Sequence, residues 1–141
     1  MIRPALTILA AWLSWALLVA APMTALAQAS PGTLPTQTSS ERGVTLKVTP
    51  KAPGPRGGRW EFRIVLDTHS ADLSDDLTQS ATLFTADGRS LRPLSWTGAG
   101  PGGHHRVGVL SFDVPAPHPT TLELRIVRPG ESAPRTFRWT P

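Results

Sequence analysis

Alternation of apolar and polar side chains with a period of two is the feature that most constrains how this chain can fold. Between residues 60 and 66, Trp, Phe, Ile and Leu occupy every second position, and residues 44–48 and 122–126 repeat the pattern with Val, Leu and Ile. Successive side chains of a strand point to opposite faces, so each segment buries one face in a sheet. No segment of useful length after residue 42 has the 3.6-residue period of an amphipathic helix. The chain is therefore predicted to be all-β.

Turn-forming residues separate about seven such segments. They are residues 44–49, 60–66, 79–85, 89–96, 107–114 and 122–126, with a last strand around Phe137 and Trp139. Asp87-Gly88 is a strong hairpin signal, and Pro93 restricts its segment to an edge strand or a bulge. Leu73 and Leu77 are spaced for one helical turn against the core. We expect a seven-stranded antiparallel sandwich of immunoglobulin or fibronectin type, with a small barrel as the alternative, and Trp60 and Trp139 inside its core.

The first 27 residues have the composition of a secretory signal peptide. Arg3 supplies a positive start, residues 5–21 are apolar, and Ala25 and Ala27 are the small residues that a signal peptidase requires. Cleavage is predicted after Ala27, and an uncleaved membrane anchor is the alternative. Both place the domain outside the cytoplasm, in the periplasm or secreted.

Residues 28–42 are rich in Ser, Thr, Pro and Gln, with almost no apolar side chain to offset the entropy of ordering. We expect a disordered linker there, followed by one β-sandwich domain over residues 43–140. The chain has no cysteine, which excludes disulfides, thiolate metal sites and cysteine nucleophiles. Its net charge of +4 comes mainly from arginines spread over every segment. No nucleic-acid partner is expected, because such proteins concentrate basic residues on one face.

Residues 96–107, WTGAGPGGHHRV, contain more glycine than a hairpin connection needs, and two adjacent histidines follow the glycines. His104 and His105, with His69 in an acidic stretch, are candidate ligands for copper or zinc. Asp67 is the fourth candidate ligand. Around them, Trp96 is expected to wall a pocket, Gly102 and Gly103 to let the backbone approach a ligand, and Asp72 to orient a ring.

Two features leave other interpretations of these residues open. A histidine pair has none of the fixed spacing of established zinc motifs, so the rings could instead cap strands and bond to the backbone. Adjacent residues on a strand point to opposite faces, so either His104 or His105 should be more buried than its neighbour.

Other chemistries find less support in the pattern. Calcium would need six to eight oxygens, and Asp67, Asp72, Asp75 and Asp76 are not in the order of a helix-loop-helix site. A triad of His69 or His105 with Ser70 and either Asp67 or Asp113 can be drawn, but the nucleophile motif Gly-x-Ser-x-Gly is absent from the sequence. The protein is therefore predicted not to be an enzyme.

Three blocks together resemble an uncharacterised family of small secreted or membrane-anchored prokaryotic β-sandwich domains. The blocks are LDTHSADL at residues 66–73, PLSWTG at 93–98 and PGGHHRVGVL at 101–110, and the resemblance covers residues 43–140. It implies a fold and a region of interest rather than a reaction. Ala99-Gly100 stands where that family would have a more acidic linker, which argues against a carboxylate-rich site.

The function expected from the sequence is a non-enzymatic, exported binding module. Its site would lie at one end of the sandwich, where His69 meets the loop of residues 102–105. The alternative is a structural or protein-interaction module of the cell envelope that binds no ligand and pairs with an unknown envelope protein through its sheet edges. The membrane would be contacted only through the N-terminal segment, if it is not cleaved.

Overall fold

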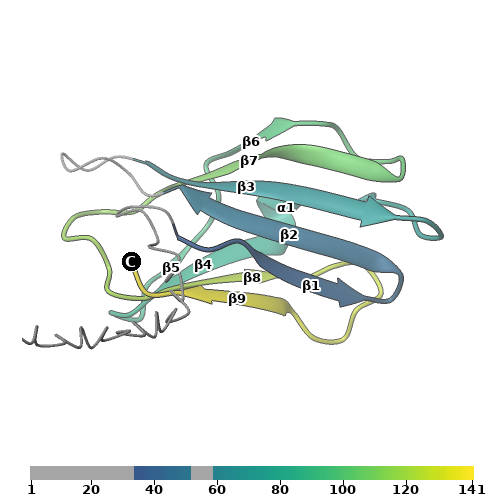
Figure 1. Cartoon of the computed structure of the whole chain (residues 1–141). Coiled ribbons are helices and arrows are strands. Elements are labelled where there is room, and N and C mark those ends of the chain that lie inside the picture. The colour runs from purple at the N-terminus through teal and green to yellow at the C-terminus, as the bar shows by residue number, and fades with distance from the viewer. Residues whose placement is uncertain (1–33, 52–58) are drawn as a thin grey trace, which may run out of the picture.

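The computed structural model describes residues 34–51 and 59–141, which form two antiparallel sheets that face each other (Figure 1). The five-stranded sheet has the order β1-β2-β3-β7-β6, in which β1 is Gln37–Glu41, β2 is Val44–Lys51, β3 is Arg59–Thr68, β7 is His105–Asp113 and β6 is Ser95–Gly98. The four-stranded sheet has the order β5-β4-β8-β9, in which β5 is Ser90–Leu91, β4 is Ala81–Thr85, β8 is Leu122–Ile126 and β9 is Arg135–Trp139. The all-β prediction is confirmed. The expected signal peptide lies outside the described residues.

The described part of the chain contains nine strands where seven were expected. One extra strand arises at Pro93, which divides the expected segment 89–96 into β5 and β6 and places them in different sheets. Proline cannot donate to a sheet, so this is where the chain crosses from one sheet to the other. The Asp87-Gly88 hairpin between β4 and β5 is present, with Gly88 at a φ of +82°.

The other extra strand, β1, lies in the segment that was expected to be disordered. It pairs along its whole length with β2, from Gln37 opposite Val48 to Glu41 opposite Val44. The two strands are joined by the tight turn Arg42-Gly43, whose φ angles are 48° and 74°. The disorder prediction is therefore wrong for residues 37–41, because hydrogen bonds to neighbouring strands stabilise a segment that buries little apolar surface.

Side-chain hydrogen bonds also attach β1 to the second sheet. The amide of Gln37 donates to the backbone carbonyl of Arg138 in β9 and accepts from its N–H at 3.2 Å. The indole of Trp139 donates to the carbonyl of Pro35 at 2.8 Å. One edge of the sandwich is thereby covered, while β6 and β5 leave the opposite edge open (Figure 1).

The inward faces of both sheets form one apolar core. Trp60 and Trp139 are buried there as predicted, 1% and 3% exposed, and the ring of Phe62 lies 5.6 Å from the rings of both Trp139 and Phe112. Fully burying one side chain of this size stabilises the fold by about 1.5–3 kcal/mol.

The short helix α1, Leu77–Ser80, connects the two sheets between β3 and β4. Leu73 and Leu77 both pack into the core, but the helical turn begins at Leu77 rather than spanning the pair. Its N-cap is Asp76, whose carboxylate accepts from the N–H of Thr78 at 3.0 Å.

Four connections gather at one end of the sandwich, on the right in Figure 1. They are residues 42–43, 69–76, 99–104 and 127–134, and we call this the loop end. The strand register explains the gathering, since Val44 pairs with Thr68 and Asp67 pairs with His105.

Gly108 in β7 offers a test of how tightly Trp96 packs over this sheet. A Cβ at Gly108 would lie 2.4 Å from the indole of Trp96 and 2.8 Å from the carbonyl of Thr97. We expect Gly108→Ala to lower the free energy of unfolding by about 1–3 kcal/mol, because the ring has to move. Gly100→Ala is the matched control: no atom lies within 4 Å of its Cβ, so urea unfolding should change by no more than about 0.5 kcal/mol. Equal stability of the two variants would contradict this packing.

Candidate functional site

Three of the four histidines lie in two connections that meet at the loop end. Asp67, at the end of β3, pairs with His105, at the start of β7. The N–H of Thr68 donates to the carbonyl of His104 at 2.9 Å, and His69 follows directly. The antiparallel β3–β7 pairing thus brings His69 to the same end as the 102–105 loop, which is the relation that the binding-site hypothesis requires.

The side chains of Asp67 and His105 are in direct contact through the carboxylate and the ring Nδ1. Both residues point away from the core on the outer face of the five-stranded sheet, and their side chains are 41% and 62% exposed. A carboxylate on Nδ1 holds the ring orientation and leaves Nε2 as the nitrogen that a metal would use.

The expected difference in burial between the two adjacent histidines is not found. His104 and His105 are both exposed. The inward position falls on Arg106, while His104 lies in the connection before the strand begins. Neither imidazole therefore has the buried structural role that strand alternation suggested.

Trp96 does not stand beside His105. It pairs with Leu110 on the inward face of β6, its indole N–H donates to the carbonyl of Ala99 at 2.9 Å, and its ring lies 5.7 Å from the guanidinium of Arg106. Trp96 and His105 lie on opposite faces of the five-stranded sheet, because inward and outward positions alternate along each strand.

Gly102 and Gly103 have a local explanation that needs no ligand. Their φ angles are +107° and +74°, values that favour glycine, and the space around both is open. Asp72 is exposed in the 69–76 connection, and no hydrogen bond to it is found within the described part of the chain.

The carboxylates at the loop end are used separately rather than together. Asp67 contacts His105, Asp75 pairs with Arg128, and Asp76 caps α1. This division does not fit the calcium hypothesis, which needs several oxygens around one point. Over residues 34–51 and 59–141 no group of three or more His, Asp or Glu side chains is arranged to hold a metal ion. Asp113, the other acid considered for a triad, lies at the far end of β7 from His105.

Arg106 ties the two histidine-containing connections together. Its side chain is buried, and Nη1 donates to the carbonyls of Leu73 and Asp75 at 2.9 and 2.8 Å. The N–H of Gly102 donates to the same Leu73 carbonyl at 2.9 Å. No local pattern indicates this role, because an arginine next to two histidines is typical of a charged surface.

A buried chain of ion pairs extends from this point across the loop end. Asp75 accepts from Arg128 with both carboxylate oxygens, at 2.6 and 3.1 Å. Arg128 lies 3.5 Å from Glu131, which accepts from Arg135 at 2.9 and 2.5 Å. Arg135 in turn donates to the carbonyls of Val44 and Glu41 at 2.8 and 2.7 Å. The chain of pairs therefore links β9 and the 69–76 and 127–134 connections to the β1–β2 turn.

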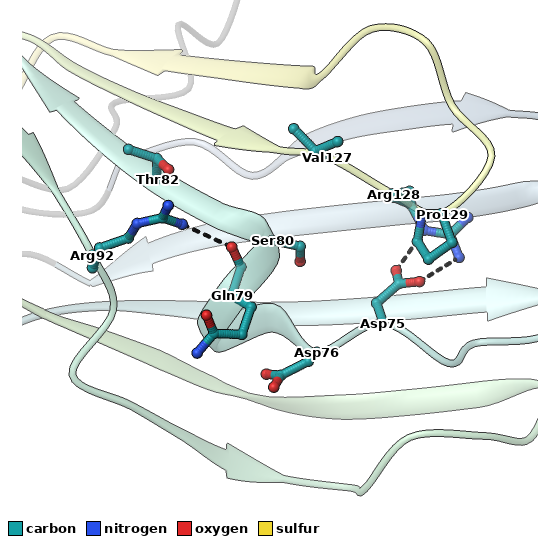
Figure 2. Close-up of a pocket in the computed structure, with 9 residues that line it drawn as sticks. All are labelled: Asp75, Asp76, Gln79, Ser80, Thr82, Arg92, Val127, Arg128 and Pro129. Atoms are coloured by element: carbon teal, nitrogen blue, oxygen red, sulfur yellow. Dashed lines mark hydrogen bonds and ion pairs between the residues drawn. The ribbon is translucent and has the colours of Figure 1, made fainter.

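A cleft of about 530 Å³ lies beside α1 at the open edge of the sandwich (Figure 2). Asp75 and Arg128 form one wall, and Arg92, from the crossover between β5 and β6, lies at the opposite side. Val127 lines the cleft with its side chain. Its N–H donates to the carbonyl of Ser80 at 2.9 Å, which attaches residue 127 to α1. This cleft is not recognisable in the sequence, because its residues come from three separate segments.

The helix in the described residues is a single turn, and nothing helical there is long and apolar enough to cross a membrane.

Replacing Arg106 tests whether it holds the loop end together. Arg106→Met keeps much of the side-chain volume but removes the guanidinium. The Asp75 carbonyl then loses its partner, while the Leu73 carbonyl keeps the Gly102 N–H, so we expect a loss of about 1–3 kcal/mol. Hydrogen exchange at Gly102 should accelerate more than exchange at the centre of β3. The exposed Arg63→Met is the control and should leave both unchanged. Unaltered exchange at Gly102 in Arg106→Met would show that Arg106 does not fix the loop.

The pH dependence of stability should depend partly on Glu131. Hydrogen bonds from Arg135, opposed in part by desolvation, hold the pKa of Glu131 below its usual 4.5. Because the folded-state pKa is lower than the unfolded one, this carboxylate stabilises the protein above about pH 4.5, and the effect is lost as the pH falls through the folded pKa.

In thermal melts between pH 6 and pH 3, Glu131→Gln should therefore start less stable than the parent and lose less stability on acidification. Asp76, Asp87 and Glu123, whose pKa values are also lowered, supply the remaining slope in both proteins. Parallel curves for parent and variant would contradict the assignment.

Comparison with known proteins assigns this site no function. The chain matches no protein-family model, no curated protein and no solved structure. What the protein does must therefore be inferred from its own residues.

Proposed function

We propose that this chain is an exported, non-enzymatic binding module that holds Cu²⁺ or Zn²⁺ at the loop end. The observation behind the proposal is the Asp67–His105 contact, with His104 adjacent in the chain and His69 next to the strand pair. A metal-binding histidine almost always donates its other ring N–H to a carboxylate, a carbonyl or water, and Asp67 is such a partner for His105.

The remaining ligands would have to turn toward His105 when the metal arrives. His69 and His104 are both exposed, and exposed side chains change rotamer on a picosecond to nanosecond scale. The two connections are already held close together by the Thr68 N–H and the Arg106 side chain. Ordering two side chains costs free energy, so the affinity should be lower than that of a preformed site.

Thermal melts with CuCl₂ or ZnCl₂ in excess test the proposal. A ligand that binds only the native state at about 100 times its Kd stabilises it by about 2.7 kcal/mol, which raises Tm by several degrees. His105→Ala should abolish this rise, and His69→Ala and His104→Ala should reduce it. His118→Ala is the control, because His118 packs 6.3 Å from Trp60 in the connection between β7 and β8 and should keep the full rise.

Lowering the pH to 5.5 should also reduce the rise, since protons compete with the metal for imidazole. If neither ion raises the Tm of the parent, or if His118→Ala loses the rise as fully as His105→Ala, the metal proposal is wrong.

A second candidate is an interaction module of the cell envelope that binds a protein partner and no metal. The strand-addition form of this idea has little support, because β5 has two residues, and β6 has four with Pro93 and Pro101 nearby. Short edges interrupted by proline are poor templates for another strand. What favours the candidate is exposed apolar surface: the large hydrophobic residues exposed in the described ranges are Leu94 and Val127, 52% each, and Val127 lines the cleft.

A further inference from the structure

The cleft beside α1 has walls that are fixed by buried interactions. Asp75 and Arg128 are 1% and 5% exposed, and their two-point ion pair holds one wall in place. The bond from Val127 N–H to Ser80 carbonyl holds the wall to the helix. A surface hollow whose walls are held this firmly needs little reorganisation to accept a ligand.

The cleft has an apolar part that is exposed to solvent rather than packed against the core. Val127 and Pro129 line it next to the buried ion pair, with Val127 half exposed (Figure 2). Val127 follows directly after β8, whose last residue, Ile126, is buried. The exposed half of the Val127 side chain is covered by nothing within residues 34–51 and 59–141, so that surface can contact a partner.

Besides the Asp75–Arg128 ion pair, the cleft is lined by two charged side chains, Arg92 and Asp76. Arg92 donates to the carbonyl of Gln79 at 2.8 Å, and no carboxylate partner for it is found among residues 34–51 and 59–141. Asp76 lies on the other side of Gln79, and the bond from the Thr78 hydroxyl lowers its pKa, so it is ionised at neutral pH (Figure 2). A ligand is therefore favoured when its negative group lies at the Arg92 side, away from Asp76.

We propose that this cleft binds an extended peptide segment of a protein partner, with an acidic side chain on Arg92 and an apolar side chain against Val127. A protein segment fits better than a small molecule. The cleft is open to solvent, whereas small-molecule sites bury most of the ligand surface. A segment that continues past the cleft gains further contact area along the open edge, where Leu94 is also exposed.

The proposal gives the interaction-module candidate a surface and a partner chemistry, and it does not depend on metal binding. In the described part of the chain no histidine lines the cleft, and neither Arg92 nor Val127 is among the residues proposed to bind the metal. Each of the two proposals can therefore fail alone.

Selection from a random dodecapeptide library against the folded chain tests the proposal. We expect enrichment of peptides that combine Asp or Glu with a Val, Leu or Ile. Titration of an enriched synthetic peptide into ¹⁵N-labelled protein should shift the amides of Gln79, Thr82 and Val127. Arg92→Gln should weaken binding by about tenfold, and Arg92→Glu by more, because an attraction becomes a repulsion. Val127→Ser should also weaken it.

Two control variants separate the outcomes. Arg63→Gln removes an exposed arginine from the outer face of the other sheet and should bind the peptide like the parent. His105→Ala should lose the metal-dependent rise in Tm and keep peptide binding, while Arg92→Gln should do the reverse. Thermal melts confirm that each variant is folded. The proposal is overturned if no enriched peptide shifts the cleft amides, if enriched peptides lack acidic residues, or if folded Arg92→Gln and Arg63→Gln bind equally.

Discussion

The loop end depends on one chain of buried charge. Arg106, Arg128 and Arg135 are each at most 5% exposed, and the structure gives them two carboxylates, Asp75 and Glu131, together with backbone carbonyls. Burying an ionised group without partners costs several kcal/mol, so these five residues are compatible with folding only as a set. Their hydrogen bonds also hold three connections in place. Arg106 binds main-chain carbonyls in the 69–76 and 99–104 connections, and the Arg128–Asp75 pair attaches the 127–134 connection. Loops that contain glycine and proline are thereby given fixed positions.

That constraint connects the two candidate functions. Residues 69–76 connect the histidine group with the cleft, since this connection begins two residues after Asp67 and ends at the helix cap Asp76, which lines the cleft. Near its start the outward parity of β3 and β7 presents Asp67 and His105. Near its end the Asp75–Arg128 pair forms a wall of the cleft. A rigid sandwich that positions loops for recognition is a common arrangement in binding proteins, but the fold alone assigns no ligand. The chemistry of the side chains has to supply that assignment.

The two edges of the sandwich are treated differently. β1 covers the edge at β9 through Gln37 and Trp139, and Arg135 donates to the carbonyls of Ser39 and Glu41 in β1. At the opposite edge the strands are short, and the crossover at Pro93 leaves the cleft between α1 and residues 127–129 uncovered. The covered edge at β1 and β9 resists aggregation, because a strand-pairing partner would have to displace existing hydrogen bonds. The open edge at β5 and β6 presents side chains rather than backbone hydrogen-bonding groups. It therefore suits a partner that is recognised by charge and apolar contact.

The sequence by itself determined the strands with a clear period of two, the hairpin at Asp87-Gly88, and the burial of Trp60 and Trp139, because alternation and turn chemistry are local properties. The approach of His69 to His104 and His105 was a condition of the metal hypothesis, and it comes from the β3–β7 pairing. Tertiary structure decided what depends on partners distant in the chain. β1 forms because β2 and β9 supply hydrogen bonds that its own composition does not reveal. Arg106 and Trp96 face inward, so Trp96 does not form a wall beside the histidines, and Gly102 and Gly103 are explained by their positive φ angles. The cleft arises where three segments meet, and no local pattern encodes such a meeting, since burial and ion pairing are settled only when the whole chain has folded.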